Sequence, residues 1–252
     1  MEKSTANQNS YFSPLIKTDS VGGGITAIIL AGGLGTRLRS AVPDLPKCMA
    51  PVNGKPFIGI VIDYFIGQGV CKFILSLGYM HEVITDYIGK AYPSLNVIYS
   101  IEDEPLGTGG AIQLACKKAD SETVLVTNGD TLFKADLHAI TAFHNQHHAQ
   151  CTLSLKPMQN FSRYGVVTLK ENGSVESFKE KQFYAEGLIN GGLYVLNVPA
   201  FLQEALPEKF SFEKDYLETF FAKRPMFGIA QDAYFIDIGI PEDYQRAQVE
   251  LG

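Results

Sequence analysis

The sequence has no long apolar run and no excess of positive charge. No stretch approaches the roughly 20 apolar residues that a membrane-spanning helix needs. The 27 Asp and Glu outnumber the 21 Lys and Arg, and this net charge of −6 argues against nucleic acid as a partner. The N-terminus lacks the basic and apolar regions of a secretory signal, so we expect a cytoplasmic protein without a membrane partner.

Cysteine is scarce, and none of the four cysteines belongs to a CxxC pair. They are Cys48, Cys71, Cys116 and Cys151, and each lies in or beside an apolar segment. This pattern predicts reduced, mostly buried thiols and no disulfide framework. Cys48 follows Lys47 and could be the most reactive of the four, but we interpret it as a small packing residue.

The 252 residues, 46% of them apolar, are enough for one large α/β domain. Residues 1–24 are polar and end in three glycines, which predicts a flexible extension. No linker interrupts residues 25–252, so we expect a single domain whose halves, 25–150 and 151–252, differ in character.

The first half alternates strand-like and helix-like segments. Strands are expected near 26–31, 71–77, 95–101 and 123–128, and helices near 55–68, 80–90, 108–118 and 135–147. This alternation predicts a Rossmann-like α/β fold, in which helices cover both faces of a mostly parallel sheet and ligands bind at the carboxyl ends of the strands.

The second half is richer in strands. They are expected at 150–156, 164–170, 174–179, 188–196 and 226–238. Asn172-Gly173 indicates a hairpin between the second and third of these. Residues Phe210 to Phe221 predict an amphipathic helix capped by Ser211, and its apolar residues could pack on the sheet or on a partner, so a homo-oligomer is possible.

A glycine-rich turn follows the first strand. The strand ends at Leu30 and Ala31, and the turn runs from Gly32 to Leu38 with Gly33, Gly35, Thr36 and Arg37 inside it. Glycine lets backbone N–H groups approach an anion, and an arginine fork suits phosphate oxygens. Lys47 supplies a second cation. The alternative is a plain strand–loop–helix connection.

Two aspartates follow apolar runs. Asp130 comes after Val124–Thr127 with Asn128 and Gly129 between, and Asp237 ends Ala233–Ile236. If folding brings the two together, their carboxylate oxygens suit Mg²⁺. Each alone could equally be a turn or cap aspartate.

Two further segments carry weaker signals. Glu104 to Ala111 opens a predicted helix with small residues that would let a flat ring lie close to the backbone, although Thr108 could simply cap the helix. Tyr164-Gly165 and Glu180-Lys181 lie on either side of the hairpin and suit sugar hydroxyls and a phosphate, but could be an exposed surface pair.

The histidines at 138, 144, 147 and 148 include one i, i+4 pair. No carboxylate or cysteine accompanies them, so we interpret the segment as a solvated helix end and not as a metal site.

Taken in order, these segments resemble the sugar-1-phosphate nucleotidylyltransferases. The likeness rests on Gly32 to Leu38, Pro46-Lys47, the GTGGA segment at Gly107, Gly129-Asp130, Tyr164 to Val167, Glu180-Lys181, Gly191 and Asp237. Within this family, Arg39 to Phe57 and Leu75 to Tyr79 look like the guanylyltransferases of D-glycero-D-manno-heptose 1-phosphate, except that Cys48 stands where proline is more usual.

The resemblance implies a glycosyltransferase-A-like fold and a reaction that joins a nucleoside triphosphate, GTP, to a heptose 1-phosphate. Residues 25–150 would bind nucleotide and 151–252 sugar phosphate. Arg37 and Lys47 would be catalytic, and Asp130 and Asp237 would hold Mg²⁺. Twelve residues would bind the nucleotide: Leu30, Ala31, Gly32, Gly33, Gly35, Thr36, Glu104, Gly107, Thr108, Gly109, Asn128 and Gly129. Six would bind the sugar phosphate: Tyr164, Gly165, Glu180, Lys181, Asn190 and Gly191.

Other activities stay open. Within the family, the substrates could be mannose 1-phosphate with GTP, or a hexose 1-phosphate with UTP or dTTP. A nucleotide-sugar-binding regulatory protein without catalysis is disfavoured, because Arg37, Lys47 and both aspartates are present. A dinucleotide-binding oxidoreductase is weaker still, since the glycine spacing is not GxGxxG.

Overall fold

The computed structural model describes residues 24–33, 38 and 41–252, and its centre is a nine-stranded sheet. Seven strands follow the order β10-β9-β11-β6-β1-β4-β5, while β8 pairs with β11 and β12 pairs with β8. The strands of the first half are β1 (Ile25–Leu30), β4 (Val70–Leu77), β5 (Asn96–Ile101) and β6 (Thr123–Asn128). Those of the second half are β8 (Cys151–Phe161), β9 (Val166–Leu169), β10 (Val175–Lys179), β11 (Tyr184–Asn197) and β12 (Met226–Ala230).

The strands β6, β1, β4 and β5 run parallel, as the alternating pattern predicts. The apolar runs of β1, β4 and β6 are buried on both faces, which is typical of parallel sheets, whereas β5 at the sheet edge is mostly half-buried. In β1, Ala27 and Ile29 join one core cluster and Ile28 joins the other. The parallel strands end at one edge, where Leu30 and Asn128 lie side by side.

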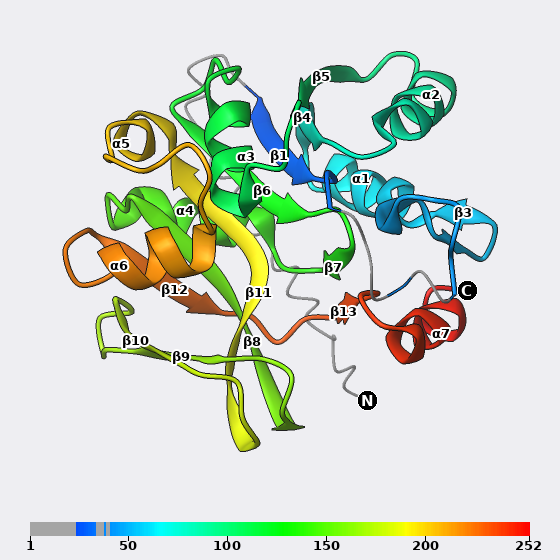
Figure 1. Ribbon diagram of the computed structural model, residues 1–252. Helices are drawn as coiled ribbons and strands as arrows, with labels where there is room; N and C mark the ends of the chain where they lie inside the picture. Colours follow the sequence, from blue (N-terminus) through cyan, green and yellow to red (C-terminus); the bar gives the residue numbers. More distant parts are fainter. Residues whose placement is uncertain (1–23, 34–37, 39–40) are drawn as a thin grey trace, which may run out of the picture.

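Helices cover both faces of this sheet (Figure 1). One cluster receives side chains from α1 (Phe57–Gly67), α2 (His81–Ala91), α4 (Leu137–Gln146) and α7 (Pro241–Glu250). The other receives side chains from α3 (Gly107–Cys116), α5 (Val198–Leu202) and the π-helix η2 (Phe212–Leu217), which continues into α6 (Glu218–Phe220). The predicted α/β fold with a mixed central sheet is therefore confirmed.

The second half forms a β-rich arm, which we define as β8 to β11 and which extends below the parallel strands in Figure 1. The arm joins the parallel part through β11, which is antiparallel to β6 and to β8. The pairing of β11 with β8 shifts register between Asn190 and Tyr194, and Gly192 there has a φ of +68°. One sheet thus carries both halves, while the division at residue 150 and the separate role of residues 1–24 stay predictions.

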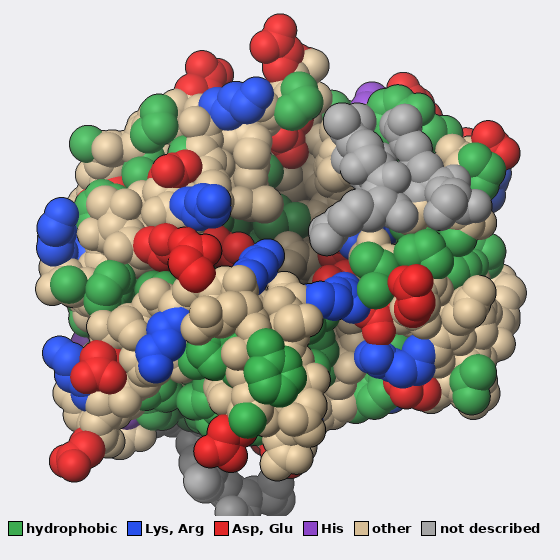
Figure 2. Space-filling view, turned by 60° about the horizontal axis from the view of Figure 1, so that its bottom comes forward, with side chains coloured by type: hydrophobic (Ala, Val, Ile, Leu, Met, Phe, Trp, Pro, Cys, Tyr) green, Lys and Arg blue, Asp and Glu red, His purple; other side chains and the backbone are tan. Residues whose placement is uncertain are grey.

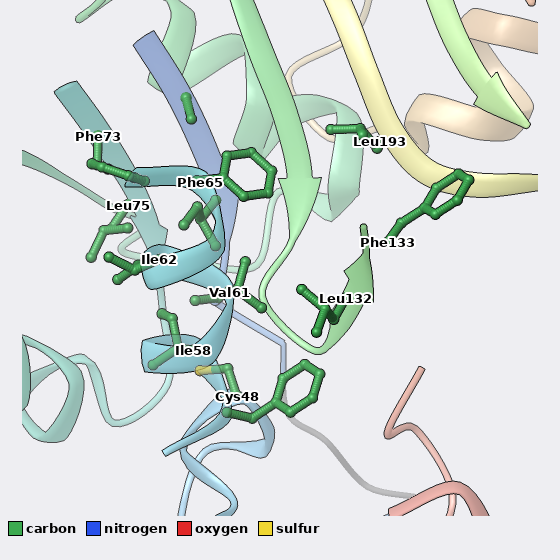
Figure 3. Close-up of a cluster of buried hydrophobic side chains, with 14 of the residues drawn as sticks. Cys48, Ile58, Val61, Ile62, Phe65, Phe73, Leu75, Leu132, Phe133 and Leu193 are labelled. Carbon is green, nitrogen blue, oxygen red and sulfur yellow. The ribbon is translucent and has the colours of Figure 1, made fainter. Parts of the chain in front are cut away.

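Small elements that the sequence patterns did not indicate surround the sheet edge. They are the 3-10 helix η1 (Lys47–Met49), the hairpin of β2 (Pro51–Val52) and β3 (Lys55–Pro56), and the pair of β7 (Thr131–Phe133) with β13 (Phe235–Asp237). Their apolar residues complete the first core cluster, in which Cys48 lies near Ile58 of α1 and Phe133 lies near Leu193 (Figure 3).

The prediction of a single strand over residues 226–238 is wrong. The segment forms two strands in different sheets, because the polar residues Gln231 and Asp232 interrupt it. The backbone N–H of Gln231 still donates to Leu155 (2.9 Å), but its side chain accepts from Asp136 N–H (2.6 Å). The chain leaves the main sheet at this point and pairs again with β7.

The helix expected over Phe210–Phe221 forms, with Ser211 as its cap, but its first part is a π-helix. The Ser211 hydroxyl accepts from Lys214 N–H (3.2 Å), and the Asp215 carboxylate accepts from Ser211 N–H (2.7 Å). Phe212 and Tyr216 are buried against the sheet, so these apolar residues need no partner protein.

The prediction that the histidine segment is a solvated helix end is wrong for His144. This side chain is 2% exposed, and its Nδ1 lies 2.9 Å from the Thr152 hydroxyl of β8. Burial lowers the pKa of His144 to about 4. No group of three or more potential metal ligands gathers among the residues with described positions, here or elsewhere. No described helix is both long and apolar enough to cross a membrane.

His144 should make stability fall in mild acid. The pKa is lower in the folded than in the unfolded chain, so its contribution is present above about pH 6.5 and is lost as pH falls toward 4. Between pH 7.5 and 5 this group alone should cost about 2 kcal/mol of unfolding free energy. Urea titrations should show a smaller loss of unfolding free energy between pH 7.5 and 5 in His144→Gln than in the wild type, whereas exposed His138→Gln should match the wild type. Equal losses in all three proteins would contradict a buried, neutral His144.

Candidate active site

A cavity of about 600 Å³ opens at the carboxyl edge of the parallel strands. It is lined from the ends of β1, β4 and β6, from the start of α3, and from η1 and β13. Figure 2 shows a hollow in the middle of this face, with acidic and basic side chains at its rim. The size is typical of a small-molecule site.

The strand ends meet closely at the floor of this cavity. The N–H of Ala31 donates to Ser76 O, and the N–H of Gly129 donates to Leu30 O, both at 2.8 Å. A Cβ on Gly32 would lie 3.1 Å from Gly78 N. Glycine therefore lets the chain after β1 run against the chain after β4, and Gly32 and Gly33 line the cavity. The rest of the predicted turn, Gly35, Thr36 and Arg37, lies outside the described residues.

Lys47 forms ion pairs with both candidate metal aspartates. Its Nζ contacts Asp130 Oδ2 directly and lies 3.5 Å from Asp237 Oδ1. All three side chains are partly buried and line the cavity. Partial burial strengthens their attraction relative to surface pairs. Two carboxylates and an ammonium from distant parts of the chain thus converge on one position.

Backbone pairing brings the two aspartates together. Asp130 ends the turn after β6, and the adjacent Thr131 begins β7, which pairs with Asp237 of β13. The Ile238 N–H donates to Asp130 O (3.0 Å), and the Gly239 N–H donates to Asp237 Oδ1 (2.8 Å). The apolar residues of β7 and β13 are buried, so core packing fixes the register that sets the carboxylates side by side.

Cys48 anchors the segment that carries Lys47 and is not itself reactive. Its side chain is buried in the first core cluster (Figure 3). Burial, with the negative charge of Asp130, raises the pKa of the thiol to about 12. The thiolate is therefore absent near neutral pH, and the interpretation as a packing residue is confirmed. Cys116 and Cys151 are buried too, whereas Cys71 is exposed.

The start of α3 forms another wall of the cavity. Gly107 has a φ of +72°, and a Cβ there would lie 2.6 Å from Phe210 O, so only glycine fits. Thr108 does not cap the helix: its hydroxyl accepts from Phe212 N–H (2.9 Å) and ties α3 to η2. Gly107 and Thr108 line the cavity, while Gly109 packs against the Phe210 ring.

Glu102 is the carboxylate at this wall. It follows β5, and its Oε2 accepts from Leu106 N–H (2.9 Å) while Oε1 lies 3.4 Å from the Ser76 hydroxyl. These contacts hold its side chain in the lining of the cavity. Glu104 instead faces a separate hollow of about 400 Å³ beside Leu114 and Glu208.

The candidate sugar-phosphate residues lie beyond the cavity, on the β-rich arm. Tyr164 packs edge-on against Phe235, two residues before Asp237, with 6.0 Å between the ring centroids. Burial, with the charge of Asp237, raises the pKa of Tyr164 to about 12, so this hydroxyl stays protonated as a donor. A Cβ on Gly165 would lie 2.6 Å from Lys179 O, which keeps β9 and β10 close.

The remaining arm residues differ in exposure. Glu180 and Lys181 are exposed after β10. The Asn190 amide donates to Tyr194 Oη (2.8 Å) and lies 3.4 Å from Glu213 Oε1, so it links β11 to η2. Gly191 packs on the Phe133 ring, and a Cβ added to Gly191 would lie only 2.4 Å from Phe133 Cδ1. Gly191 thus packs on β7, the strand that follows Asp130, and none of these residues lines the cavity itself.

The structure brings ten predicted residues into the cavity wall and leaves nine described ones outside it. Those in the wall are Leu30, Ala31, Gly32, Gly33, Lys47, Gly107, Thr108, Asn128, Asp130 and Asp237. Those outside are Glu104, Gly109, Gly129, Tyr164, Gly165, Glu180, Lys181, Asn190 and Gly191. Sequence reasoning missed Ser76, Glu102, Thr131 and Gly239, although Glu102 follows a strand end just as Asp130 does.

The two aspartates fit a divalent cation. Their carboxylates already face one position, and the Lys47 ammonium places a positive charge there. Mg²⁺ binds through one or two carboxylates and fills its other positions with water and phosphate, so it needs no third protein ligand.

Gly239 has no room for a side chain beside this ion-pair group. A Cβ would lie 2.7 Å from Asp237 Oδ1 and 2.8 Å from Lys47 Nζ. We expect Gly239→Ala to displace these groups and to slow the pyrophosphate release that the resemblance implies by about 10-fold or more. Gly89→Ala on α2 is the matched control, since no atom lies within 4 Å of its Cβ. Unchanged turnover in Gly239→Ala would show that this spacing is unimportant.

Comparison with known proteins shows the family to which this chain belongs. A family model described as Nucleotidyl transferase matches residues 26–252. The D-glycero-alpha-D-manno-heptose 1-phosphate guanylyltransferase of Aneurinibacillus thermoaerophilus is 52% identical over 225 residues, covering 89% of this chain and 97% of the relative. Its Campylobacter jejuni counterpart is 46% identical over 218 residues, with 86% and 96% covered. The crystal structure of HddC from Yersinia pseudotuberculosis complexed with GMP-PN superposes with a TM-score of 0.82 at 38% identity, covering 90% of this chain and all of that one. The chain therefore belongs to the nucleotidyl transferase family.

Proposed function

We propose that this enzyme joins GTP and D-glycero-α-D-manno-heptose 1-phosphate to give GDP-heptose and pyrophosphate. The names of the relatives at 52% and 46% identity support the two substrates. The observation that carries the chemistry is the convergence of Lys47, Asp130 and Asp237 in a cavity floored by the glycine-rich strand end.

The reaction needs positioning more than proton transfer. A phosphate oxygen of the sugar 1-phosphate attacks the α-phosphorus of GTP, a new P–O bond forms, and the bond to the β-phosphate breaks so that pyrophosphate leaves. The nucleophile is already an anion, so no general base is required. The main barrier is the repulsion between two polyanions that must meet in line, and fixed cations and N–H groups lower it.

On the nucleotide side, the backbone of Gly32 and Gly33 would hold the triphosphate, and Lys47 would neutralise charge at the α-phosphate. Lys47 now pairs with two aspartates, and it would exchange a carboxylate for the phosphate when nucleotide binds. Arg37, with Gly35 and Thr36, is assigned to the triphosphate by the resemblance alone.

On the sugar side, the β-rich arm would bind the heptose phosphate. Tyr164, Gly165, Asn190 and Gly191 would contact this substrate, and the protonated Tyr164 hydroxyl can donate to a sugar oxygen. Glu180 would accept from sugar hydroxyls, and the exposed Lys181 would turn to the sugar phosphate.

Asp130 and Asp237 would hold Mg²⁺ in this proposal. The cation, when bound, offsets negative charge on the nucleotide and sugar phosphates. The protein's own part is to hold the two carboxylates at one position through the pairing of β7 with β13.

Glu102 offers a physical reason for choosing guanine. Guanine carries N–H donors on N1 and N2, while adenine has no matching pair of donors. A carboxylate can accept both, because its two oxygens offer about four acceptor sites and only two are used by Leu106 and Ser76. Glu102 lines the cavity at the start of α3, where the small residues Gly107 and Thr108 leave room for a flat base.

The cellular setting belongs to the same proposal. The four free cysteines suit a reducing compartment, so the enzyme would work in the cytoplasm. The product is an activated sugar, so a glycosyltransferase that builds cell-surface polysaccharide would consume it.

A substrate panel tests the function directly. We expect pyrophosphate release with GTP and heptose 1-phosphate to exceed that of any other pair drawn from GTP, ATP, UTP and dTTP with heptose, mannose or glucose 1-phosphate. Preference for mannose 1-phosphate, or for UTP or dTTP, would replace the proposed substrates. No turnover with any pair would indicate a binding protein.

The same assay tests Glu102. We expect Glu102→Gln to lower kcat/KM for GTP by about 10-fold or more, the scale for hydrogen bonds to a charged acceptor. It should also weaken the preference for GTP over ITP, which lacks the N2 amine. Asp103→Asn, an exposed neighbour outside the cavity, is the control. An unchanged GTP-to-ITP ratio in Glu102→Gln would remove Glu102 from base selection.

Metal removal tests the aspartate pair. EDTA should abolish turnover and Mg²⁺ should restore it. Asp130→Asn and Asp237→Asn should each lower kcat/KM by at least ~10²-fold, the scale for losing one preorganised charge, and should raise the Mg²⁺ concentration needed. Exposed Asp86→Asn on α2 controls for net charge. Full activity in chelator would exclude a metal role for the pair.

A further inference from the structure

Helix α7 lies against the β2–β3 hairpin at the lower right of Figure 1. It begins at Pro241, four residues after Asp237. Tyr244 and Gln248 face the hairpin one helical turn apart. Neither residue lines the cavity, and the function described above gives them no role.

Four hydrogen bonds join this helix to the hairpin. The Tyr244 hydroxyl and the Gln248 Nε2 both donate to the single carbonyl of Pro51, at 2.6 and 2.8 Å. Asn53 at the hairpin turn donates its backbone N–H to Gln248 Oε1 and its side-chain amide to Gln248 O, both at 2.9 Å. Asn53 has a φ of +49°, so the turn that presents these donors is itself a specific conformation. We call these four bonds the α7 clamp.

The clamped hairpin is the continuation of the segment that carries Lys47. Lys47 begins η1, the Ala50 N–H donates to Lys47 O (3.1 Å), and Pro51 follows at once. The Phe57 N–H donates to Ala50 O (3.1 Å), which closes the hairpin base onto α1. Only three residues, Cys48 to Ala50, separate Pro51 from Lys47.

Helix α7 also continues the segment that carries Asp237. The two members of one ion pair, Lys47 and Asp237, thus belong to two chain segments that are fastened together at α7. Lys47 is reached through the hairpin and Asp237 through Gly239 and Ile240. The clamp joins the segment from Lys47 to Pro51 to the segment from Asp237 to Gln248 and so closes a loop that includes the ion pair. The length of this loop limits how far apart the Lys47 ammonium and the Asp237 carboxylate can lie.

We propose that Tyr244 and Gln248 are positioning residues that hold Lys47 at its working distance from Asp237 and from the α-phosphate. This inference rests on the proposed role of Lys47. The competing account is that burial of Cys48, Met49 and Ala50 in the core fixes Lys47 without the clamp. The two accounts make opposite predictions for variants that remove only the clamp.

Kinetics separate the two accounts. Tyr244→Phe removes one of the four bonds, and Gln248→Ala removes the two that its side-chain amide makes. Exposed Gln245→Ala on the same helix is the control. We expect kcat to fall about 10-fold in Gln248→Ala and less in Tyr244→Phe, because small misplacements of catalytic groups slow chemistry. KM for both substrates and the melting temperature should stay near those of Gln245→Ala. Wild-type kcat in both variants would overturn the proposal.

A double-mutant cycle shows whether the clamp acts through Lys47. In a Lys47→Ala background, Gln248→Ala should reduce the residual turnover by less than about 2-fold, because a group that acts only through Lys47 has nothing left to place. An undiminished, multiplicative effect in that background would mean that the clamp only supports the fold.

A third readout needs no turnover. Lys47 is paired and its side chain is 12% exposed, so an acetylating reagent followed by mass spectrometry should modify it slowly in the wild type. The rate should rise about 3-fold or more in Gln248→Ala, as about 0.6 kcal/mol of lost pairing implies, and stay constant in Gln245→Ala. Lys72, equally buried but far along the sheet in β4, is the internal standard. An unchanged Lys47 rate would overturn the clamp even if the proposed substrates proved wrong.

Discussion

The cavity is organised around two negative charges and one positive charge that are held at a single place. Asp130 and Asp237 would repel each other at the distances that Lys47 spans, and their partial burial makes that repulsion costly. The positive charge of Lys47 offsets this repulsion, and packing of the surrounding segments stabilises the close approach of the three groups. The β7–β13 pair, the buried Cys48 and the Gly239 turn all serve this one requirement. The rest of the cavity is built outward from it.

A parallel sheet suits this requirement because it ends several strands at one edge. The chains after β1, β4 and β6 meet there through backbone bonds from Ala31 and Gly129. Each strand end contributes a different chemical group: backbone donors after β1, the Ser76 hydroxyl at the end of β4, and a carboxylate after β6. The helices on both faces then bury the sheet behind this edge.

The sequence was sufficient for features with local signals. The parallel strands have long apolar runs, Asn172-Gly173 marks its hairpin, and Asp130 and Asp237 follow apolar runs, so each could be predicted. Contacts between distant segments could not. Nothing near Lys47 indicates that its ammonium pairs with both aspartates. His144 lies in a polar stretch, and only the packing of α4 on β8 buries it. Glu102 carries one local signal, its place directly after the strand that ends at Ile101, whereas the contacts of its carboxylate with Ser76 and Leu106 form only in the fold.

The irregularity of β11 at Asn190–Tyr194 has an evolutionary consequence. Gly191 and Gly192 leave no space for a methyl group against Phe133 and Asn128, so substitution there disturbs the edge that carries Asp130. Beyond this point, β8 to β10 and the first part of β11 reach away from the parallel strands (Figure 1). Where the arm does not pack on Phe235 of β13, as Tyr164 does, mutations would leave the charged trio in place. If the arm binds the sugar as proposed, such a scaffold would allow sugar preference to change while the phosphate chemistry is retained.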